Sequence, residues 1–124
     1  MLEKCGNYLG EGFRRIIYEH KDNPKLVIKF LKDPKDRHNF YEFDNWLRLG
    51  DTERGLWLAP CYELTPDFRF LTQMKVEVTD EIPSNIPEWI KVQRDYEFGG
   101  NKSRHWGRYQ GRLVLIDYGD MQFI

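Results

Sequence analysis

Residues 26–31 read L-V-I-K-F-L, and this stretch decides how the rest of the chain is interpreted. Its branched apolar residues predict a short, largely buried β-strand. Lys29 lies in the middle of that strand, where an unpaired ammonium group would cost several kcal/mol of lost hydration. The lysine must therefore meet an anion, such as Glu42 or a bound phosphate, or else lie on an edge strand and face solvent.

A helix is predicted directly after this strand, over residues 34–49. Asp33 is a good N-cap, Pro34 suits the first helical position, and Gly50 suits the end of a helix. Glu42 lies beside the apolar stripe of this helix, so we expect its carboxylate to face the sheet and to pair with the strand lysine. The stripe consists of three residues at helical spacing: Phe40, Phe43 and Leu47.

Strands and turns account for most of the remaining sequence. Two β-prone stretches flank a glycine-containing turn within residues 6–18. Runs of strands with one inserted helix indicate a single α+β domain for residues 1–124. The other predicted elements are strands over 55–64 and 68–78, a loop-rich segment over 79–104 with a short helix around 86–93, and a hairpin over 106–116.

The glycine-containing turn carries the first chemical signal. Residues 9–12 read L-G-E-G, so Gly10 and Gly12 would let the backbone approach phosphate groups. Arg15 lies near the place where longer patterns of this kind have a third glycine. A simple β-turn is the alternative interpretation of this segment.

A second signal lies at the end of the predicted hairpin, where residues 113–119 read L-V-L-I-D-Y-G. Asp117 follows four consecutive apolar residues, so its carboxylate would be poorly solvated and would require a cation or hydrogen-bond donors. An aspartate in an ordinary type I turn is the alternative.

Taken together, these segments resemble the protein-kinase-like superfamily across nearly the full length of the chain. The L-V-I-K stretch is similar to the kinase V-A-I-K segment, and residues 113–119 are similar to the strand that leads into D-F-G, with tyrosine for phenylalanine. The resemblance implies an N-lobe over residues 1–78, with a five-stranded antiparallel sheet and one helix. It also implies a vestigial, much-reduced C-lobe over residues 79–124 that ends just after D-Y-G.

The same resemblance implies roles for individual residues and two cofactors, ATP and Mg²⁺. Lys29 would contact the ATP phosphates, Glu42 would hold the lysine, and Asp117 would bind Mg²⁺. The residues expected to contact the nucleotide are Gly10, Gly12, Lys29, Met74 and Val76. Truncated kinase-like proteins of this sort occur in bacteriophages, so the resemblance also allows a viral origin.

The kinase catalytic loop has no clear counterpart in the chain. The string Gln93-Arg94-Asp95 is the nearest match to its H-R-D motif, which would make Asp95 the catalytic base and Asn101 a second metal ligand. Asn101 stands six residues beyond Asp95 rather than five. A different alignment, counted back from the hairpin, places His105 near the expected asparagine, and the two alignments disagree.

A competing site is a basic and aromatic stretch over residues 98–116. Positive side chains next to stacking rings suit a phosphate backbone, single-stranded bases or an acidic protein. A solvated hairpin with Trp106 packed in the core is the alternative. The basic residues are Lys102, Arg104, Arg108 and Arg112, interleaved with His105, Trp106 and Tyr109.

Composition narrows the classes of function. The formal net charge is −1, so no global field draws the protein to nucleic acid or to an anionic membrane. The two cysteines, Cys5 and Cys61, form no C-x-x-C pair and fit a reducing compartment. No apolar run approaches the ~18 residues that span a bilayer. We therefore expect a cytoplasmic protein, in the host cytoplasm if the protein is viral.

Three functions remain open from the sequence. The first is a degenerate kinase fold that binds a protein partner, to inhibit or to mimic it. The second is an active ATP- and Mg²⁺-dependent phosphotransferase that uses Lys29, Glu42, Asp117 and Asp95. The third, which we rank lowest, is nucleic-acid binding through the hairpin. A partner or a second copy of the chain would supply the surface that a reduced C-lobe lacks.

Overall fold

The computed structural model describes residues 1–92, 106–119 and 121. Within these ranges the chain forms a mixed α+β fold with one main helix. The strands are β1 (Cys5–Glu11), β2 (Arg15–His20), β3 (Leu26–Leu31), β4 (Cys61–Leu64), β5 (Phe70–Met74), β6 (Glu77–Val78), β7 (Trp106–Tyr109) and β8 (Arg112–Leu115). The helices are α1 (His38–Leu49) and α2 (Glu88–Lys91), with 3₁₀ turns η1 (Leu2–Lys4) and η2 (Glu53–Trp57).

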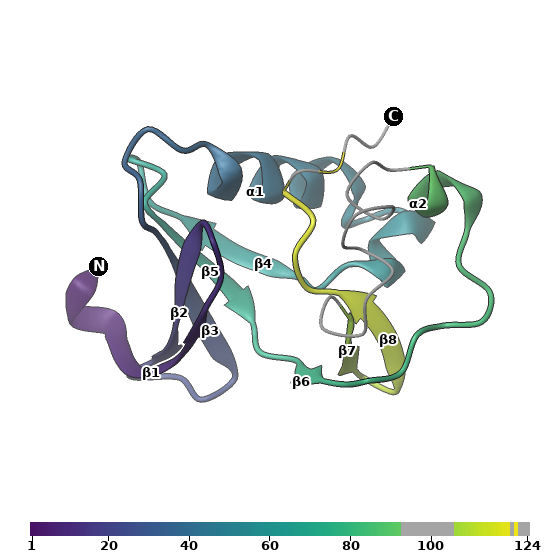
Figure 1. The fold of residues 1–124 in the computed structure, drawn as a ribbon, viewed down its shortest axis with the longest axis horizontal. Coiled ribbons are helices and arrows are strands. Elements are labelled where there is room, and N and C mark those ends of the chain that lie inside the picture. The colour runs from purple at the N-terminus through teal and green to yellow at the C-terminus, as the bar shows by residue number, and fades with distance from the viewer. Residues whose placement is uncertain (93–105, 120, 122–124) are drawn as a thin grey trace.

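A five-stranded antiparallel sheet forms the first half of the fold, in the order β1-β2-β3-β5-β4. Helix α1 is inserted between β3 and β4 and lies along this sheet (Figure 1). The predicted α+β class and the five-stranded antiparallel sheet with one helix are confirmed. Strand β3 is central and almost entirely buried, as the apolar L-V-I-K-F-L stretch predicted.

A second, three-stranded sheet follows, in the order β6-β7-β8. The predicted hairpin is confirmed: Gln110 and Gly111 both have positive φ, at 51° and 79°, which is the twist that a two-residue hairpin turn requires. The two sheets meet where the Ala59 backbone N–H donates to the Leu115 carbonyl at 2.9 Å. After β8 the chain runs back toward α1, which brings residues 116–119 beside the first sheet (Figure 1).

Two of the predicted strands have different bounds. The strand predicted over 55–64 begins only at Cys61, because residues 53–57 form the 3₁₀ turn η2. The strand predicted over 68–78 is divided into β5 and β6, which belong to different sheets. The short helix predicted around 86–93 exists as α2, which has a single turn.

Helix α1 begins four residues later than predicted, because two aspartates form turns instead. Asp33 does not cap a helix: its carboxylate accepts the Lys35 backbone N–H at 2.9 Å. Asp36 then accepts the backbone N–H of His38, the first helical residue, at 2.9 Å. Aspartate side chains that accept a backbone N–H two residues on form local turns that compete with a helix. The helix ends at Leu49, with Gly50 as C-cap in a right-handed conformation.

Of the predicted apolar stripe of α1, only Phe43 is partly buried and packs against the core. Phe40 and Leu47 are exposed, at 37% and 65% of their surface, while the buried face is mostly polar. That face repeats at helical spacing and consists of His38, Asn39, Glu42, Asn45 and Leu49. A polar face turned toward a sheet must find partners there, and it does so in the site described below.

The apolar core is built from residues of α1, α2, both sheets and the segment after β8. Both cysteines are free thiols, and Cys61 is buried in this core, where burial raises its pKa to about 12. Among the described residues, no helix is long and apolar enough to cross a membrane. The buried core residues are Leu49, Leu58, Cys61, Leu71, Ile86, Ile90, Trp106, Leu115, Tyr118 and Met121.

Asn39 connects α1 to the first sheet through hydrogen bonds. Its amide donates to the carbonyls of Lys29, Phe68 and Arg69 at 3.0–3.1 Å. Phe68 has a φ of 65°, which is unusual for a bulky residue and costs free energy that these contacts must offset.

We therefore expect Asn39→Ala to lower the free energy of unfolding by ~1–3 kcal/mol. The substitution removes the donor to these carbonyls, and it also removes the oxygen that accepts a hydrogen bond from Arg15 Nη1. Urea denaturation of the variant, beside the exposed Asn7→Ala as a control, measures this loss. Equal midpoints for the two variants would contradict the role given to Asn39.

Candidate functional site

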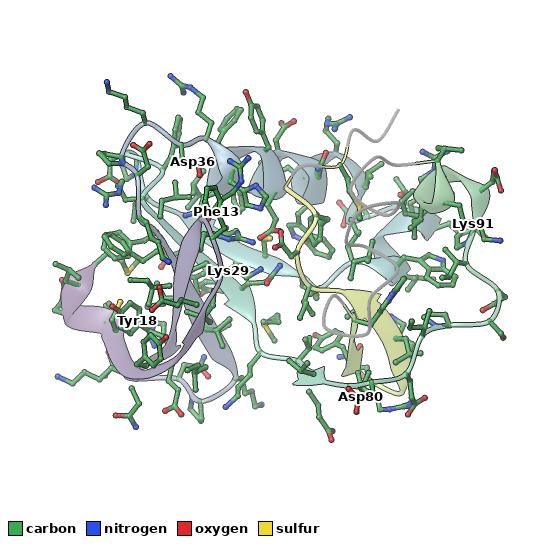
Figure 2. All side chains as sticks on the ribbon, viewed as in Figure 1. Phe13, Tyr18, Lys29, Asp36, Asp80 and Lys91 are labelled. Atoms are coloured by element: carbon green, nitrogen blue, oxygen red, sulfur yellow. The ribbon has the colours of Figure 1, made fainter. Side chains whose placement is uncertain are left out.

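Lys29 and Glu42 form a buried ion pair, as the sequence predicted. Lys29 Nζ lies 3.0 Å from Glu42 Oε2, and the two residues are 5% and 0% exposed. Strand β3 supplies the lysine (Figure 2), and the buried face of α1 supplies the glutamate. The alternative of an edge-strand lysine in solvent is wrong, because β3 lies between β2 and β5.

Glu42 has two further partners. Arg15, on β2, donates from Nη1 to Glu42 Oε2 at 2.7 Å and is 5% exposed. The Tyr118 backbone N–H donates to Glu42 Oε1 at 2.6 Å. One buried carboxylate therefore joins β2, β3, α1 and the segment after β8.

Asp117 reaches the same cluster. Its Oδ1 lies 3.0 Å from Arg15 Nη2 and accepts a hydrogen bond from His38 Nε2 at 2.8 Å. Lys29 also donates from Nζ to the carbonyl of Ile116, directly before the aspartate. Lys29, Glu42 and Asp117, which the sequence predicted to converge, are thus brought together.

Two members of the cluster, Arg15 and His38, were missed as site residues. His38 stands four residues before Glu42 and so shares its helical face, a signal that was already present in the helix predicted over residues 34–49. Arg15 shares a sheet face with Lys29, because Ile17 pairs with Lys29 and side chains on a strand alternate. The sequence did not reveal this register.

The cluster holds its carboxylates in the ionised state. Burial favours the neutral acid, but the charges of Arg15 and Lys29 outweigh it and lower the pKa of Glu42. Desolvation also raises the pKa of the half-exposed Asp117, but the charge of Arg15 and the hydrogen bond from His38 outweigh it and hold this pKa well below the ordinary value. Arg15 itself loses hydration, yet Glu42 and Asp117 raise its pKa.

A pocket of ≈1110 Å³ opens beside the cluster. It is larger than typical ligand pockets of ~300–1,000 Å³. Phe13, at the tip of the β1–β2 hairpin, is 95% exposed and belongs to the pocket wall (Figure 2). The wall also contains the predicted nucleotide contacts Gly10, Gly12, Lys29, Met74 and Val76, together with Arg15, His38 and Asp117.

Close packing does not explain the two glycines of the pocket wall. A Cβ added to Gly10 or Gly12 would meet no atom within 4 Å, and neither residue has a positive φ. Packing among the described residues therefore does not require glycine at either position. Both glycines line the pocket.

Gly119, by contrast, is required by close packing. A Cβ at Gly119 would lie 2.7 Å from the His38 carbonyl oxygen and 2.8 Å from its imidazole ring. Such distances are too short for any side chain. The glycine of the D-Y-G segment therefore allows His38 to reach Asp117.

The tyrosine of this segment is anchored in the core. The buried Tyr118 hydroxyl donates to the Ala59 carbonyl at 2.7 Å. Burial and the neighbouring Cys61 raise its pKa well above the ordinary value, so the hydroxyl stays a donor. Asn45 binds the carbonyls of Tyr118 and Met121, each at 3.0 Å.

Several predicted site residues lie outside the described residues: Asp95, Asn101, Lys102, Arg104 and His105. The described part of the basic stretch makes contacts within the chain. Arg108 pairs with Glu81, Arg112 donates to the Leu56 carbonyl at 2.9 Å, and Trp106 is fully buried.

The surroundings of the described residues disfavour a divalent ion. His38, Glu42 and Asp117 place ligand atoms within 4.8 Å of one another. However, both Glu42 oxygens accept hydrogen bonds, and Asp117 Oδ1 is shared by Arg15 and His38. Mg²⁺ requires oxygen ligands in open octahedral geometry, whereas two buried protein cations adjoin this cluster and would repel it.

Comparisons with known proteins identify no family for this chain. A scan against models of protein families found no match, and a search of curated proteins found no significant match. The function must therefore be argued from the geometry of the site.

We expect Glu42→Gln to lower the free energy of unfolding by ~3–5 kcal/mol, because it leaves Lys29 and Arg15 as buried cations without their shared anion. Glu63→Gln, on the exposed side of β4, is the matched control and should change stability by less than ~0.5 kcal/mol. Chemical denaturation compares the two, and similar losses would contradict the central role of Glu42.

We also expect acid to destabilise the protein partly through Asp117. Below its ordinary pKa of 3.8 the unfolded chain takes up a proton at Asp117 that the folded chain still excludes. The free energy of unfolding should therefore fall as pH falls from about 4 toward the lowered native value. Asp117→Asn removes this contribution, so denaturation measured at several pH values should show a shallower decline. Parallel curves would refute the assignment.

Proposed function

We propose that this chain is a kinase-like protein with a degenerate catalytic site, which binds an adenine nucleotide in the pocket beside Lys29. In this proposal the protein acts by binding, and the nucleotide-loaded fold associates with a partner protein. The kinase-like identity of the fold and the role of the D-Y-G segment are part of the proposal.

One observation carries it: the buried cation of β3, the glycine turn and the aspartate after β8 all border one pocket. Lys29 and Glu42 make the strand-to-helix ion pair by which kinases position a phosphate-binding lysine. The size of the pocket is sufficient for a nucleotide. Met74, the last residue of β5, and Val76, which lies between β5 and β6, also line the pocket and are the residues proposed to contact the base.

The same geometry favours binding over phosphoryl transfer. Transfer requires a metal on the aspartate after the last strand, because the metal neutralises the charge that develops on the phosphates. Here Arg15 and His38 already occupy Asp117 Oδ1. An aspartate engaged in this way supports a role in holding the site together.

Nucleic-acid binding receives less support. The described basic side chains of the hairpin, Arg108 and Arg112, are engaged with Glu81 and with the Leu56 carbonyl. Trp106 is in the core and has no exposed face on which a base could stack.

ATP should raise the melting temperature of the protein. At a concentration of ~100 times the dissociation constant, the added stability is ~2.7 kcal/mol. Lys29→Met should weaken ATP binding by about tenfold to a hundredfold, since a charged hydrogen bond contributes ~1.5–3 kcal/mol. Titration calorimetry measures the affinity, and Lys21→Met, an exposed lysine outside the pocket, is the control.

A second variant separates binding from folding. Gly12→Val adds a side chain to the pocket wall where the fold offers free space, so the melting temperature should be unchanged while ATP affinity falls. If ATP causes no stabilisation and no heat of binding, the proposal fails.

A further inference from the structure

Arg15 occupies the position between the two carboxylates of the site. Its guanidinium contacts Glu42 at 2.7 and 3.4 Å, Asp117 at 3.0 Å and Asn39 at 3.1 Å. The side chain is 5% exposed and also belongs to the pocket wall. A guanidinium held by this many partners is fixed in place, and it carries its charge at every accessible pH.

The charges of this cluster balance without any added ion. Arg15 and Lys29 contribute two positive charges, and Glu42 and Asp117 contribute two negative charges, so the sum is zero. If Arg15 were neutral, the sum would be −1, and a cation would be needed beside Asp117. With Arg15 in place, a divalent ion would add two positive charges to a site that is already compensated.

We propose that the Arg15 guanidinium takes the place of a divalent metal, so that a nucleoside polyphosphate binds in this pocket without Mg²⁺. This inference rests on the proposed nucleotide-binding function and specifies the state of the ligand. The free polyphosphate anion, and not its metal complex, is the bound form. Arg15 is a positioning residue in this scheme, because it neutralises Asp117, which would otherwise repel the phosphates.

Two features of the pocket agree with a metal-free anion. Lys29, the second buried cation, lines the same pocket and can donate a hydrogen bond to a phosphate oxygen. His38 donates to the Asp117 oxygen that Arg15 also contacts, which further reduces the negative charge seen from the pocket.

Calorimetric titration of the intact chain with ATP tests the inference, once in EDTA and once in excess MgCl₂. We expect tight binding in EDTA and clearly weaker apparent binding in excess MgCl₂, because Mg²⁺ then complexes most of the free anion that the pocket takes up. Equal or tighter binding in MgCl₂, or binding in MgCl₂ alone, would overturn the inference and leave the nucleotide-binding proposal standing. Absence of binding under both conditions would overturn both. These outcomes use the unaltered protein and so do not depend on the folding of a variant.

Arg15→Gln sharpens the test. Without the guanidinium, ATP binding in EDTA should be lost and binding in MgCl₂ retained, whereas Arg15→Lys should keep binding in EDTA. Arg48→Gln, which removes an arginine of α1 outside the pocket, should match the unaltered protein in both buffers.

Manganese provides a readout that is independent of nucleotide. Electron paramagnetic resonance of Mn²⁺ should show no tight binding to the unaltered chain and a gain of binding in Arg15→Gln, because Asp117 is then free to act as a ligand. Tight Mn²⁺ binding by the unaltered chain at Asp117, abolished by Asp117→Asn, would overturn the inference.

Discussion

The carboxylate of Glu42 is the constraint on which the arrangement of this protein depends. It is completely removed from water and accepts hydrogen bonds from Lys29, Arg15 and the Tyr118 backbone. A buried charge without partners would be very costly, so the elements that supply these donors must be packed around it. One side chain therefore links strands β2 and β3, helix α1 and the segment after β8, in addition to the backbone pairing of β2 with β3.

This constraint explains why α1 turns a polar face to the sheet. His38, Glu42 and Asn45 each form a hydrogen bond with residue 117 or 118. Asn39 binds backbone carbonyls in and beside the first sheet. The exposed phenylalanine and leucine on the outer side of the helix follow from the same cause, because the inner positions are occupied by the polar groups. Directional hydrogen bonds fix the rotation of the helix and its distance from β3. Leu49, Phe43 and Trp46 add apolar packing against the core.

The sequence was sufficient for the parts of the site that follow from local patterns. A lysine within an apolar strand requires an anion, and an aspartate after four apolar residues requires donors; both requirements are met within one cluster. Arg15 could not be found in this way, since its place depends on the register of β2 against β3, a non-local property. The late start of α1 arose from aspartate turns that compete locally with helix capping. The helical spacing of His38 and Glu42 was visible in the sequence, but the contact of His38 with Asp117 depends on the path of the chain after β8.

The contact between Gly119 and His38 has a mechanical consequence. Gly119 and His38 are packed too closely for any atom to fit between them, and Asn45 and Glu42 form hydrogen bonds with the backbone of Tyr118. Helix α1 and residues 117–119 can therefore be displaced only together. A hinge motion that withdrew the helix alone would break all of these contacts at once. The fold therefore lacks a low-cost route to a disengaged helix, and a ligand would meet a binding surface that is already assembled before it arrives.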